Sequence, residues 1–539
     1  MAPPAKSPLP ASPAAGLSPS LSSAASASAS ASASTAAQLI QSIPQGKRRR
    51  GWDDGIHPIL RPLVRAYLLG YASTVAPRLA TLLIQHLTRL FKKYYDTQKQ
   101  EAASTPTSTS TKQSTDTFLA SLIRTLKGGF DWHRFPTFCA LLAGGSTLLE
   151  VPWKAAFDRL AKNLSEYSLT YTIRSRLSRF IASFTSAYLS LLILQSKPTT
   201  SFTTTTTSPD GTTTTQTHLA GRTLDLTLFA LTRALDVIIG TAWNLHRQRR
   251  QSLHQWTRLE SLLSRITDPA IFALSSGMVM WSWFYYPSSL PRAYNKWIDS
   301  AAAVDSRLIQ ALQRCHEGTL RYGEETGQAE LLGSMCKDYN LPPVWGDPAK
   351  SVPFPCEIVH MGCGPSCEYH ALSRFVRSFK WAMTTYLPLS LLLALRNPTK
   401  KAFTRAVLSA ARTSTFLGTF ITLFYYGVCL ARTRVGPYVI GRGPKERNLI
   451  DGGVCVGTGC VLCGWSILIE KAGRRKDGGL FVAPRAMATL LPRRYPKAKE
   501  WMERVVFAGS TGVVFTCVLE DKGRVRGVLG GLLAGVLNR

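Results

Sequence analysis

Residues 270–286 read AIFALSSGMVMWSWFYY, a run of seventeen residues without a charged side chain. Its tryptophans and tyrosines gather at the C-terminal end, as they do in membrane helices that carry an aromatic belt at the lipid–water interface. A related stretch, VFAGSTGVV at 506–514, aligns with IFALSSGMV at 271–279. The sequence therefore predicts apolar membrane helices that belong to a repeated unit.

The composition of the whole chain agrees with this reading. Of its 539 residues, 64 are Lys or Arg and 32 are Asp or Glu, a formal net charge of +32, yet charged residues make up only 18%. Soluble domains have about 25%. Basic clusters follow several apolar segments, so we expect them to contact the bilayer and its anionic headgroups. Because these clusters flank apolar segments and do not cover one face, we expect no nucleic-acid partner.

Three further matches keep the same order in both halves of the chain. They pair residues 63–67 with 375–379, 146–149 with 414–417, and 228–234 with 480–486. We therefore predict an all-α integral membrane protein with two tandem homologous units, 56–290 and 371–520, each of four to five membrane helices. Five crossings per unit would make the repeats inverted, as in many transporters, and a first segment lying flat would make them parallel.

The ends and loops have a different composition. Residues 1–50 are rich in Ser, Ala and Pro and cannot bury a core, so we expect a disordered tail. The block KRRR at 47–50 is interpreted as a basic flank of a membrane helix, with a nuclear or nucleic-acid signal as the alternative. The Thr/Ser-rich stretches 97–117 and 197–217 are predicted to be flexible loops, and 521–539 is a Gly-rich C-terminal tail segment.

Arg233 and Arg485 occupy equivalent positions in the 228–234 and 480–486 match. One interpretation is a contact to an anion or a headgroup, or a charge that lines a cavity. The other is an arginine that reaches the membrane surface or pairs with a helix acid such as Asp236. The glycines also suggest sites, because small residues four apart let membrane helices pack closely or form oligomers, although glycine is frequent in membrane helices in any case. The glycines in question are Gly527, Gly531 and Gly535 in one run and Gly453 and Gly457 in another.

A polar, Cys-rich linker, 292–370, joins the two units. Its dense part reads CEIVHMGCGPSC, residues 356–367. Three thiols and one imidazole, Cys356, His360, Cys363 and Cys367, can close a tetrahedral zinc site. The spacing is not that of a usual zinc motif, so a disulfide and reduced structural thiols remain open as alternatives. Apart from such an ion, we expect no cofactor.

The same segment resembles the transmembrane protein 135 family. The shared elements are a Cys, Glu-Ile, His, Pro-Ser-Cys box, a Tyr-x-Pro-Leu span, a Ser-x-Phe-Leu element and an Ile-Leu-Ile-Glu ending followed by basic residues. In this chain they are Cys356, Glu357, Ile358, His360, Pro365, Ser366 and Cys367, then Tyr386, Pro388 and Leu389, then Ser414, Phe416 and Leu417, and finally 467–475. The likeness covers about 356–520, and it extends distantly to four-helix translocase subunits of the mitochondrial inner membrane.

This resemblance implies a multi-pass protein of peroxisomal or mitochondrial membranes, linked to organelle organisation, fission balance and lipid metabolism. It implies no catalytic residue. The chain has no recognisable catalytic motif of the common hydrolase, metalloprotease or phosphate-loop kinds, so we expect no enzyme. The internal repeat favours an alternative function, a transporter or channel for a lipid-derived or anionic solute. A homo-oligomer or organelle-dynamics proteins are the expected protein partners.

Overall fold

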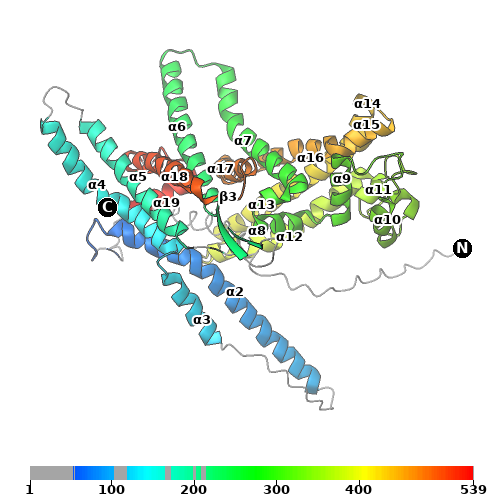
Figure 1. The fold of residues 1–539 in the computed structure, drawn as a ribbon, viewed down its shortest axis with the longest axis horizontal. Helices are drawn as coiled ribbons and strands as arrows, with labels where there is room; N and C mark the ends of the chain where they lie inside the picture. Colours follow the sequence, from blue (N-terminus) through cyan, green and yellow to red (C-terminus); the bar gives the residue numbers. More distant parts are fainter. Residues whose placement is uncertain are drawn as a thin grey trace.

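The structure is a computed structural model, and it describes residues 53, 55–101, 118–163, 171–197, 199, 202–207, 214–521 and 523–537. The predicted tail 1–50 and residues 102–117 of the first Thr/Ser-rich stretch lie outside the described residues. The described part is almost entirely helical, with three short strands (Figure 1).

The described elements fall into a first half, a Cys-rich segment and a second half. The first half contains α2 (Arg61–Glu101), α3 (Phe118–Lys127), η1 (Gly128–Phe130), α4 (Phe135–Asn163), α5 (Tyr171–Gln195), β1 (Thr203–Thr207), β2 (Thr214–Ala220), α6 (Leu224–Ser252) and α7 (Arg258–Tyr285). The Cys-rich segment contains η3 (Pro287–Ser289), α8 (Arg292–Ala302), α9 (Ser306–Glu317), α10 (Ala329–Asp338), η4 (Pro343–Gly346) and α11 (Cys356–Val359).

The second half begins with two long helices and continues through shorter pieces. It contains α12 (Cys367–Ala394), α13 (Lys400–Cys429), η5 (Leu430–Arg434), α14 (Val435–Val439), α15 (Pro444–Leu449), η6 (Ile450–Val454), α16 (Cys455–Cys463), η7 (Gly464–Ile469), α17 (Ala472–Thr489), β3 (Tyr495–Pro496), η8 (Lys497–Lys499), α18 (Glu500–Glu520) and α19 (Gly527–Leu537). The segments η5 and η6 are π-helical.

Six helices of the described chain are long and apolar enough to cross a membrane. They are Arg61–Arg89, Tyr171–Gln195, Leu224–Ser252, Lys400–Val439, Pro444–Ile469 and Lys497–Glu520. These helices indicate an integral membrane protein. The uncharged run 270–286, which the sequence predicts to be a membrane helix, lies in α7 up to Tyr285. α7 is not one of the six, because the run's serines, tryptophans and tyrosines are much less apolar than Leu or Ile.

The last long helix of each half packs against helices of the other half. α4 contacts α2 and α5, as α13 contacts α12 and α16. α18 then packs on α5 and α6, whereas α7 packs on α16 and α17. Figure 1 shows α18 beside α5 at one end of the molecule and α7 beside α17 near its centre. α7 of the first half thus packs on helices of the second half, and α18 of the second half packs on helices of the first. We call these two the exchanged helices.

In the match between 271–279 and 506–514, most paired residues have the same burial. Phe272 and Phe507 are 5% and 2% exposed, and the following Ala273 and Ala508 are 6% and 0% exposed. The matched glycines make matched contacts. A Cβ atom on Gly277 would lie 3.0 Å from the Cys460 carbonyl oxygen in α16, and one on Gly512 would lie 2.8 Å from the Phe180 ring in α5. Glycine therefore permits the close approach of both exchanged helices.

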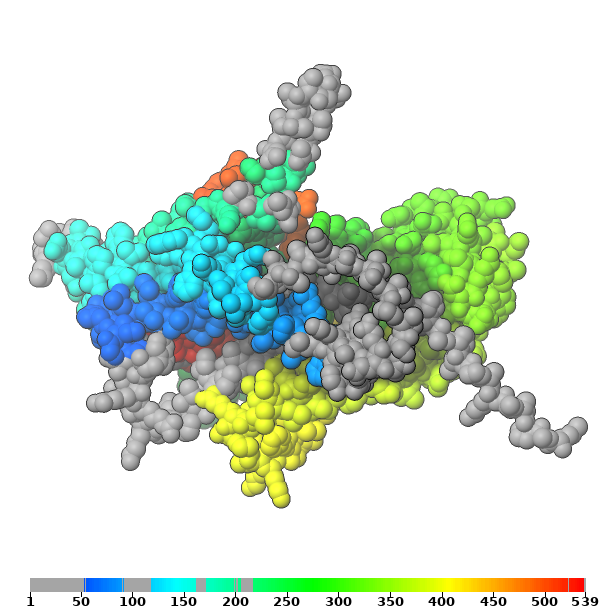
Figure 2. Space-filling view, turned by 90° about the horizontal axis from the view of Figure 1, so that it is seen from below, coloured from blue at the N-terminus to red at the C-terminus, as the bar shows by residue number. Residues whose placement is uncertain are grey.

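The Cys-rich segment 292–370 folds as a small helical lobe at one end of the molecule (Figure 2, light green). Leu308, Met335, Phe354 and Ile358 are almost completely buried in it. Their cluster continues without a break into residues of α7, α13, α16 and α17. The lobe is therefore packed onto the long helices and shares their core.

The second Thr-rich stretch differs from the expected flexible loop. Where it is described, it forms β1 and β2, an antiparallel pair in which Thr203 lies opposite His218. Ala220 of β2 also pairs with Tyr495 of β3. Threonine is β-branched and favours extended backbone over helix, which explains a hairpin in a Thr-rich sequence. Composition alone does not distinguish such a hairpin from a loop.

Candidate metal centre

Cys356 and His360 lie one helical turn apart in the lobe. Cys356 is the first residue of α11, which follows Pro355, and His360 is the residue that ends it. A spacing of four residues places two side chains on the same face of a helix. The short helix therefore presents a thiol and an imidazole in the same direction.

Cys367 and Cys429 complete the cluster from two other elements. Cys367 is the first residue of α12 and Cys429 is the last residue of α13. The ligand atoms of Cys356, His360, Cys367 and Cys429 all lie within 4.8 Å of one another, and His360 and Cys429 are buried. The cluster can hold a metal ion. It joins the lobe to the end of α13, which is part of the span-length helix Lys400–Val439.

Cys363, which the sequence placed in the metal set, is not one of these four residues. Its Sγ atom lies 3.9 Å from the Ser373 hydroxyl. The chain between His360 and Cys367 turns through left-handed conformations at Met361, Gly362 and Gly364. This turn brings Cys367 back to His360 and leaves Cys363 on the side of Ser373. The fourth ligand is Cys429, which is 62 residues further along the chain than Cys367.

Hydrogen bonds orient the imidazole toward the thiols. His360 Nδ1 lies 2.7 Å from the Gly364 carbonyl oxygen, so Nδ1 carries a proton and donates it. The other ring nitrogen, Nε2, lies 3.4 Å from Cys429 Sγ. A carbonyl that fixes the tautomer and orientation of a histidine is typical of metal sites. The His370 ring stacks on His360 with centroids 4.5 Å apart, and burial lowers the pKa of His370 to about 3.

The electrostatics of the cluster favour a thiolate. The hydrogen bond from Cys429, together with His360 and the Arg432 guanidinium, lowers the pKa of Cys356 to about 4 against the effect of burial. Burial works to lower the pKa of His360, but its bonds to Cys356 and Gly364 outweigh this and raise it. Metals bind the thiolate form of cysteine.

A buried ion pair lies beside the cluster. Arg432 Nε lies 2.5 Å from Asp451 Oδ1 and its Nη2 lies 2.9 Å from Oδ2, and both side chains are 2% exposed. Tyr322 of the lobe donates to Asp451 at 2.5 Å, and Arg432 Nη2 donates to the Phe354 carbonyl at 3.0 Å. Arg432 Nη1 is 4.0 Å from Cys356 Sγ. The π-helical segments η5 and η6 carry the arginine and the aspartate.

Sequence reasoning missed Cys429, Arg432, Asp451 and Tyr322. Cys429 and Arg432 stand at the end of an apolar run, where a cysteine or an arginine is ordinarily read as packing or as a helix flank. No spacing rule connects them with residue 356. All eleven cysteines are free thiols in the structure, so the disulfide alternative is not the arrangement observed.

Arg233 is a buried residue of α6. It is 6% exposed, and its guanidinium lies 5.2 Å from the ring centroid of Phe229. The carboxylates of Asp477 and Asp236 lie close enough to favour its charged form, although its Nε and Nη1 atoms have no hydrogen-bond partner among the described residues. Asp236, the acid named as a partner for Arg233, instead forms an ion pair with Arg526, so the role of Arg233 stays a prediction.

Arg485 has a similar local setting in α17. Its Nη1 atom donates to the Phe481 carbonyl at 2.6 Å, and its guanidinium lies 3.9 Å from the Phe481 ring centroid. Phe481 and Phe229 both precede their arginine by one turn. The Tyr294 ring of α8 lies 5.2 Å from the same guanidinium. The two arginines thus share a phenylalanine ring one turn earlier but differ in their hydrogen bonds and in their tertiary neighbours.

The predicted packing glycines have unequal surroundings. Cβ atoms on Gly453 and Gly457 would lie 3.4 and 3.6 Å from the Trp281 ring, which is ordinary contact. A Cβ atom on Gly527, whose φ is +77°, would collide with the Asp477 carboxylate. At Gly531 and Gly535 no described atom lies within 4 Å of such a Cβ atom. Tight packing instead occurs at Gly427 and Gly459, where α13 and α16 meet.

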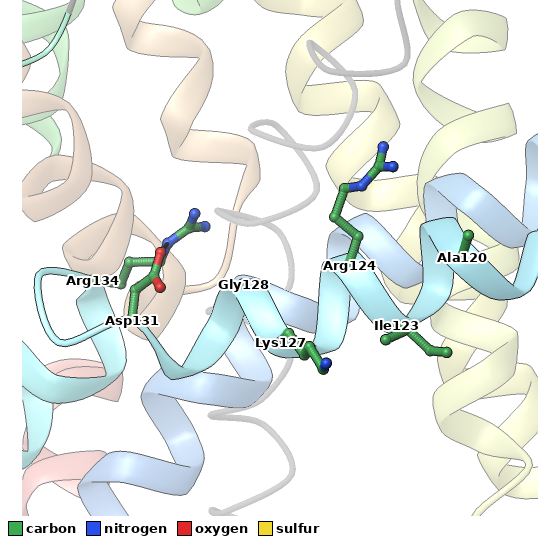
Figure 3. Close-up of a pocket in the computed structure, with 7 residues that line it drawn as sticks. All are labelled: Ala120, Ile123, Arg124, Lys127, Gly128, Asp131 and Arg134. Atoms are coloured by element: carbon green, nitrogen blue, oxygen red, sulfur yellow. Dashed lines mark hydrogen bonds and ion pairs between the residues drawn. The ribbon is translucent and has the colours of Figure 1, made fainter. Parts of the chain in front are cut away.

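An open groove of about 640 Å³ runs along α3 and the turn that follows it. Arg124, Lys127 and Arg134 line it together with Ile123, and Figure 3 shows Arg124 and Ile123 pointing to opposite sides of α3. Large apolar side chains nearby are exposed, namely Leu119, Phe130 and Trp132. Basic and exposed apolar side chains on a short helix are typical of an element at a membrane surface.

The fold and the cluster together define a helical protein with six helices long and apolar enough to span a membrane, and with a Cys/His cluster that could hold a metal ion between its lobe and α13. Comparison of the chain with protein-family models, with curated proteins and with solved structures finds no match.

Proposed function

We propose that this chain is a multi-pass protein of the peroxisomal or mitochondrial membrane that organises or regulates the organelle, including its fission balance and lipid metabolism. The observation that carries the proposal is the connection of the Cys-rich lobe to the span-length helices through Cys356, His360, Cys367 and Cys429. The organelle and the role follow from the resemblance of this same segment to the transmembrane protein 135 family.

The ion that suits the cluster is Zn²⁺. Three thiolates and one imidazole form a soft donor set, which selects zinc over magnesium or calcium. Four protein ligands leave no open position for substrate, so the expected role is structural. Held between α11, α12 and α13, the ion would fix the lobe against the membrane helices, and the neighbouring Arg432 would offset the surplus negative charge of three thiolates.

Lipid and a second copy of the chain are the proposed partners. The basic and apolar surface of α3 fits anionic headgroups. Gly531 and Gly535 meet no described atom of this chain at the position of a Cβ, which leaves that face of α19 open to another helix.

A second candidate function, a transporter, is favoured by the antiparallel packing of α6 and α17. Asp225 near the start of α6 accepts two hydrogen bonds from Arg493, just beyond the end of α17, at 2.7 and 3.0 Å. Toward the other end of the pair, Arg233 lies near Asp477 of the first turns of α17. If α6 and α17 are equivalent helices of the two repeats, their antiparallel contact requires a pseudo-twofold axis perpendicular to the helix axes. That symmetry belongs to inverted repeats, whose substrate sites lie between the units.

The experiment that tests the first proposal is localisation of a C-terminally tagged chain with peroxisomal and mitochondrial markers, combined with carbonate extraction. An extraction-resistant signal on either organelle, together with altered organelle number or shape after deletion, is the expected result. A soluble or nuclear signal would overturn it. For the transporter, solute flux into vesicles carrying R233Q, R485Q and the double variant is compared with the parent at equal insertion, and unchanged flux excludes a role for these arginines.

A further inference from the structure

A second cavity, of about 380 Å³, lies where the lobe meets α12. Four segments line it. The turn between α8 and α9 contributes Val304 and Asp305, the end of α10 contributes Tyr339, the left-handed turn after α11 contributes Met361, and α12 contributes Arg374 and Arg377. None of these residues belongs to the Cys/His cluster, and all lie outside the span-length helices.

The guanidinium of Arg374 is fixed in place at the wall of this cavity. Arg374 is 5% exposed, its Nη1 atom donates to the Ala303 carbonyl at 3.0 Å, and its guanidinium lies 4.6 Å from the ring centroid of Tyr425. Its Nη2 atom faces the thioether sulfur of Met361 at 3.4 Å. A thioether is a weak hydrogen-bond acceptor. The Nη2 group of Arg374, a strong donor at the cavity wall, therefore lacks a strong acceptor.

The charge of the cavity lining is positive. In the part of the chain that the structure describes, neither Arg374 nor Arg377 forms an ion pair with a carboxylate. Asp305, the acid of the lining, is held by Arg307, whose Nη2 atom lies 2.8 Å from its carboxylate. A buried cation without a counter-charge is costly, and an anion in the cavity would remove that cost.

We propose that this cavity binds a phosphate group, either free or as the headgroup of an amphiphile. Arginine suits phosphate because its planar fork can donate two parallel hydrogen bonds to phosphate oxygens. Arg374 supplies the preorganised inner contact, and Arg377, three residues further along α12 and exposed, supplies the outer one. The Ser373 hydroxyl, which also lines the cavity, is a third donor. Val304 and Met361 form an apolar wall that accommodates an attached chain.

The test measures binding of two probes to the purified full-length protein in a nonionic detergent, by calorimetry at one fixed ionic strength. The probes are inorganic phosphate and dihexanoyl phosphatidic acid. R377Q is the test variant, and K380Q, an exposed cation three residues further along α12, is the matched control. We expect R377Q to bind at least about tenfold more weakly, since hydrogen bonds to charged groups are the strong ones, and K380Q to bind as the parent does.

A second variant, S373F, fills the cavity without removing a charge. We expect it to abolish binding while the thermal midpoint stays near that of the parent. Binding of both probes identifies the phosphate group alone as the ligand, and binding of the lipid alone identifies a headgroup. Three results would each overturn the proposal. They are that neither probe binds, that R377Q and K380Q weaken binding equally, or that S373F binds as the parent does.

Discussion

His360 Nε2 and Cys429 Sγ lie 3.4 Å apart, although 69 residues separate them in the chain. His360 belongs to the lobe and Cys429 to the end of α13, so this contact forms only when the lobe packs against α13. It also decides which residues form the metal set.

The first prediction concerns that metal set. Purified full-length protein should contain about one zinc per chain, because the four ligands form one closed site. C429S should lose most of the metal, whereas C363S should retain it, since Cys363 faces Ser373 and not the cluster. Metal analysis by mass spectrometry measures both. Equal loss of zinc in the two variants would show that Cys363 is also a ligand. A parent protein without metal would contradict the zinc proposal.

The second prediction concerns the ion pair between Arg432 and Asp451. D451A leaves a buried guanidinium without its partner and should lower the free energy of unfolding by about 3–5 kcal/mol. A double variant, R432M with D451L, should recover much of this loss, because a buried ion pair is often replaceable by apolar residues of similar volume. Thermal unfolding in detergent compares the variants. D131N, in an exposed pair with Arg134, is the control and should change little.

The third prediction tests the exchange of α7. A Cβ atom on Gly277 would lie 4.0 Å from Cys460 Cβ in α16, which is within the range for a disulfide. G277C should therefore form an intramolecular cross-link with Cys460 under mild oxidation, detected by mass spectrometry after proteolysis. G509C, at a position with no described neighbour within 4 Å, is the control. If G277C forms no cross-link while the protein stays folded, α7 does not pack on α16.

The fourth prediction compares two glycines. A Cβ atom on Gly459 would lie 2.8 Å from the Phe424 carbonyl oxygen, whereas one on Gly531 would meet nothing. G459V should destabilise the protein by about 1–3 kcal/mol, the usual cost of overpacking. G531V should leave the thermal midpoint almost unchanged. If α19 contacts a second copy, G531V will instead shift the oligomeric state, which light scattering of the detergent complex measures.

The fifth prediction concerns pH and Asp305. This residue caps α9 by accepting the Arg307 backbone N–H at 2.9 Å. Hydrogen bonds from Arg307, with a further one from Tyr339, lower the pKa of Asp305 below 3.8 against the effect of burial. Its stabilising contribution is therefore present above the unfolded pKa and is lost as the pH falls through the lower folded value.

D305A should thus cost about 1 kcal/mol at pH 7, as the loss of a helix cap does. The difference from the parent should narrow as the pH falls below 4. Thermal midpoints of both proteins across pH 3–7 measure this. A difference that stays constant through the acid range would show that the cap acts through packing and not through charge.

The sequence could predict the local character of most elements. Apolar runs and their flanking basic residues predict long helices, which the structure confirms. The two tandem units inferred from matches such as Phe272 with Phe507 stay a prediction, although these two residues are both buried. The membrane itself, the organelle and the resemblance to the transmembrane protein 135 family stay predictions. Composition was a poor guide where polar residues follow one another, as at Thr203–Thr207, because it fixes neither strand pairing nor register.

What the sequence determined by itself is the helical class and the clustering of cysteines in one segment, because hydrophobicity and ligand chemistry are properties of single residues and short spacings. The tertiary structure alone decided that Cys429 replaces Cys363, that Arg432 meets Asp451, and that α7 and α18 change sides. These contacts join segments far apart in the chain. Their geometry depends on how whole helices pack, which no local pattern encodes.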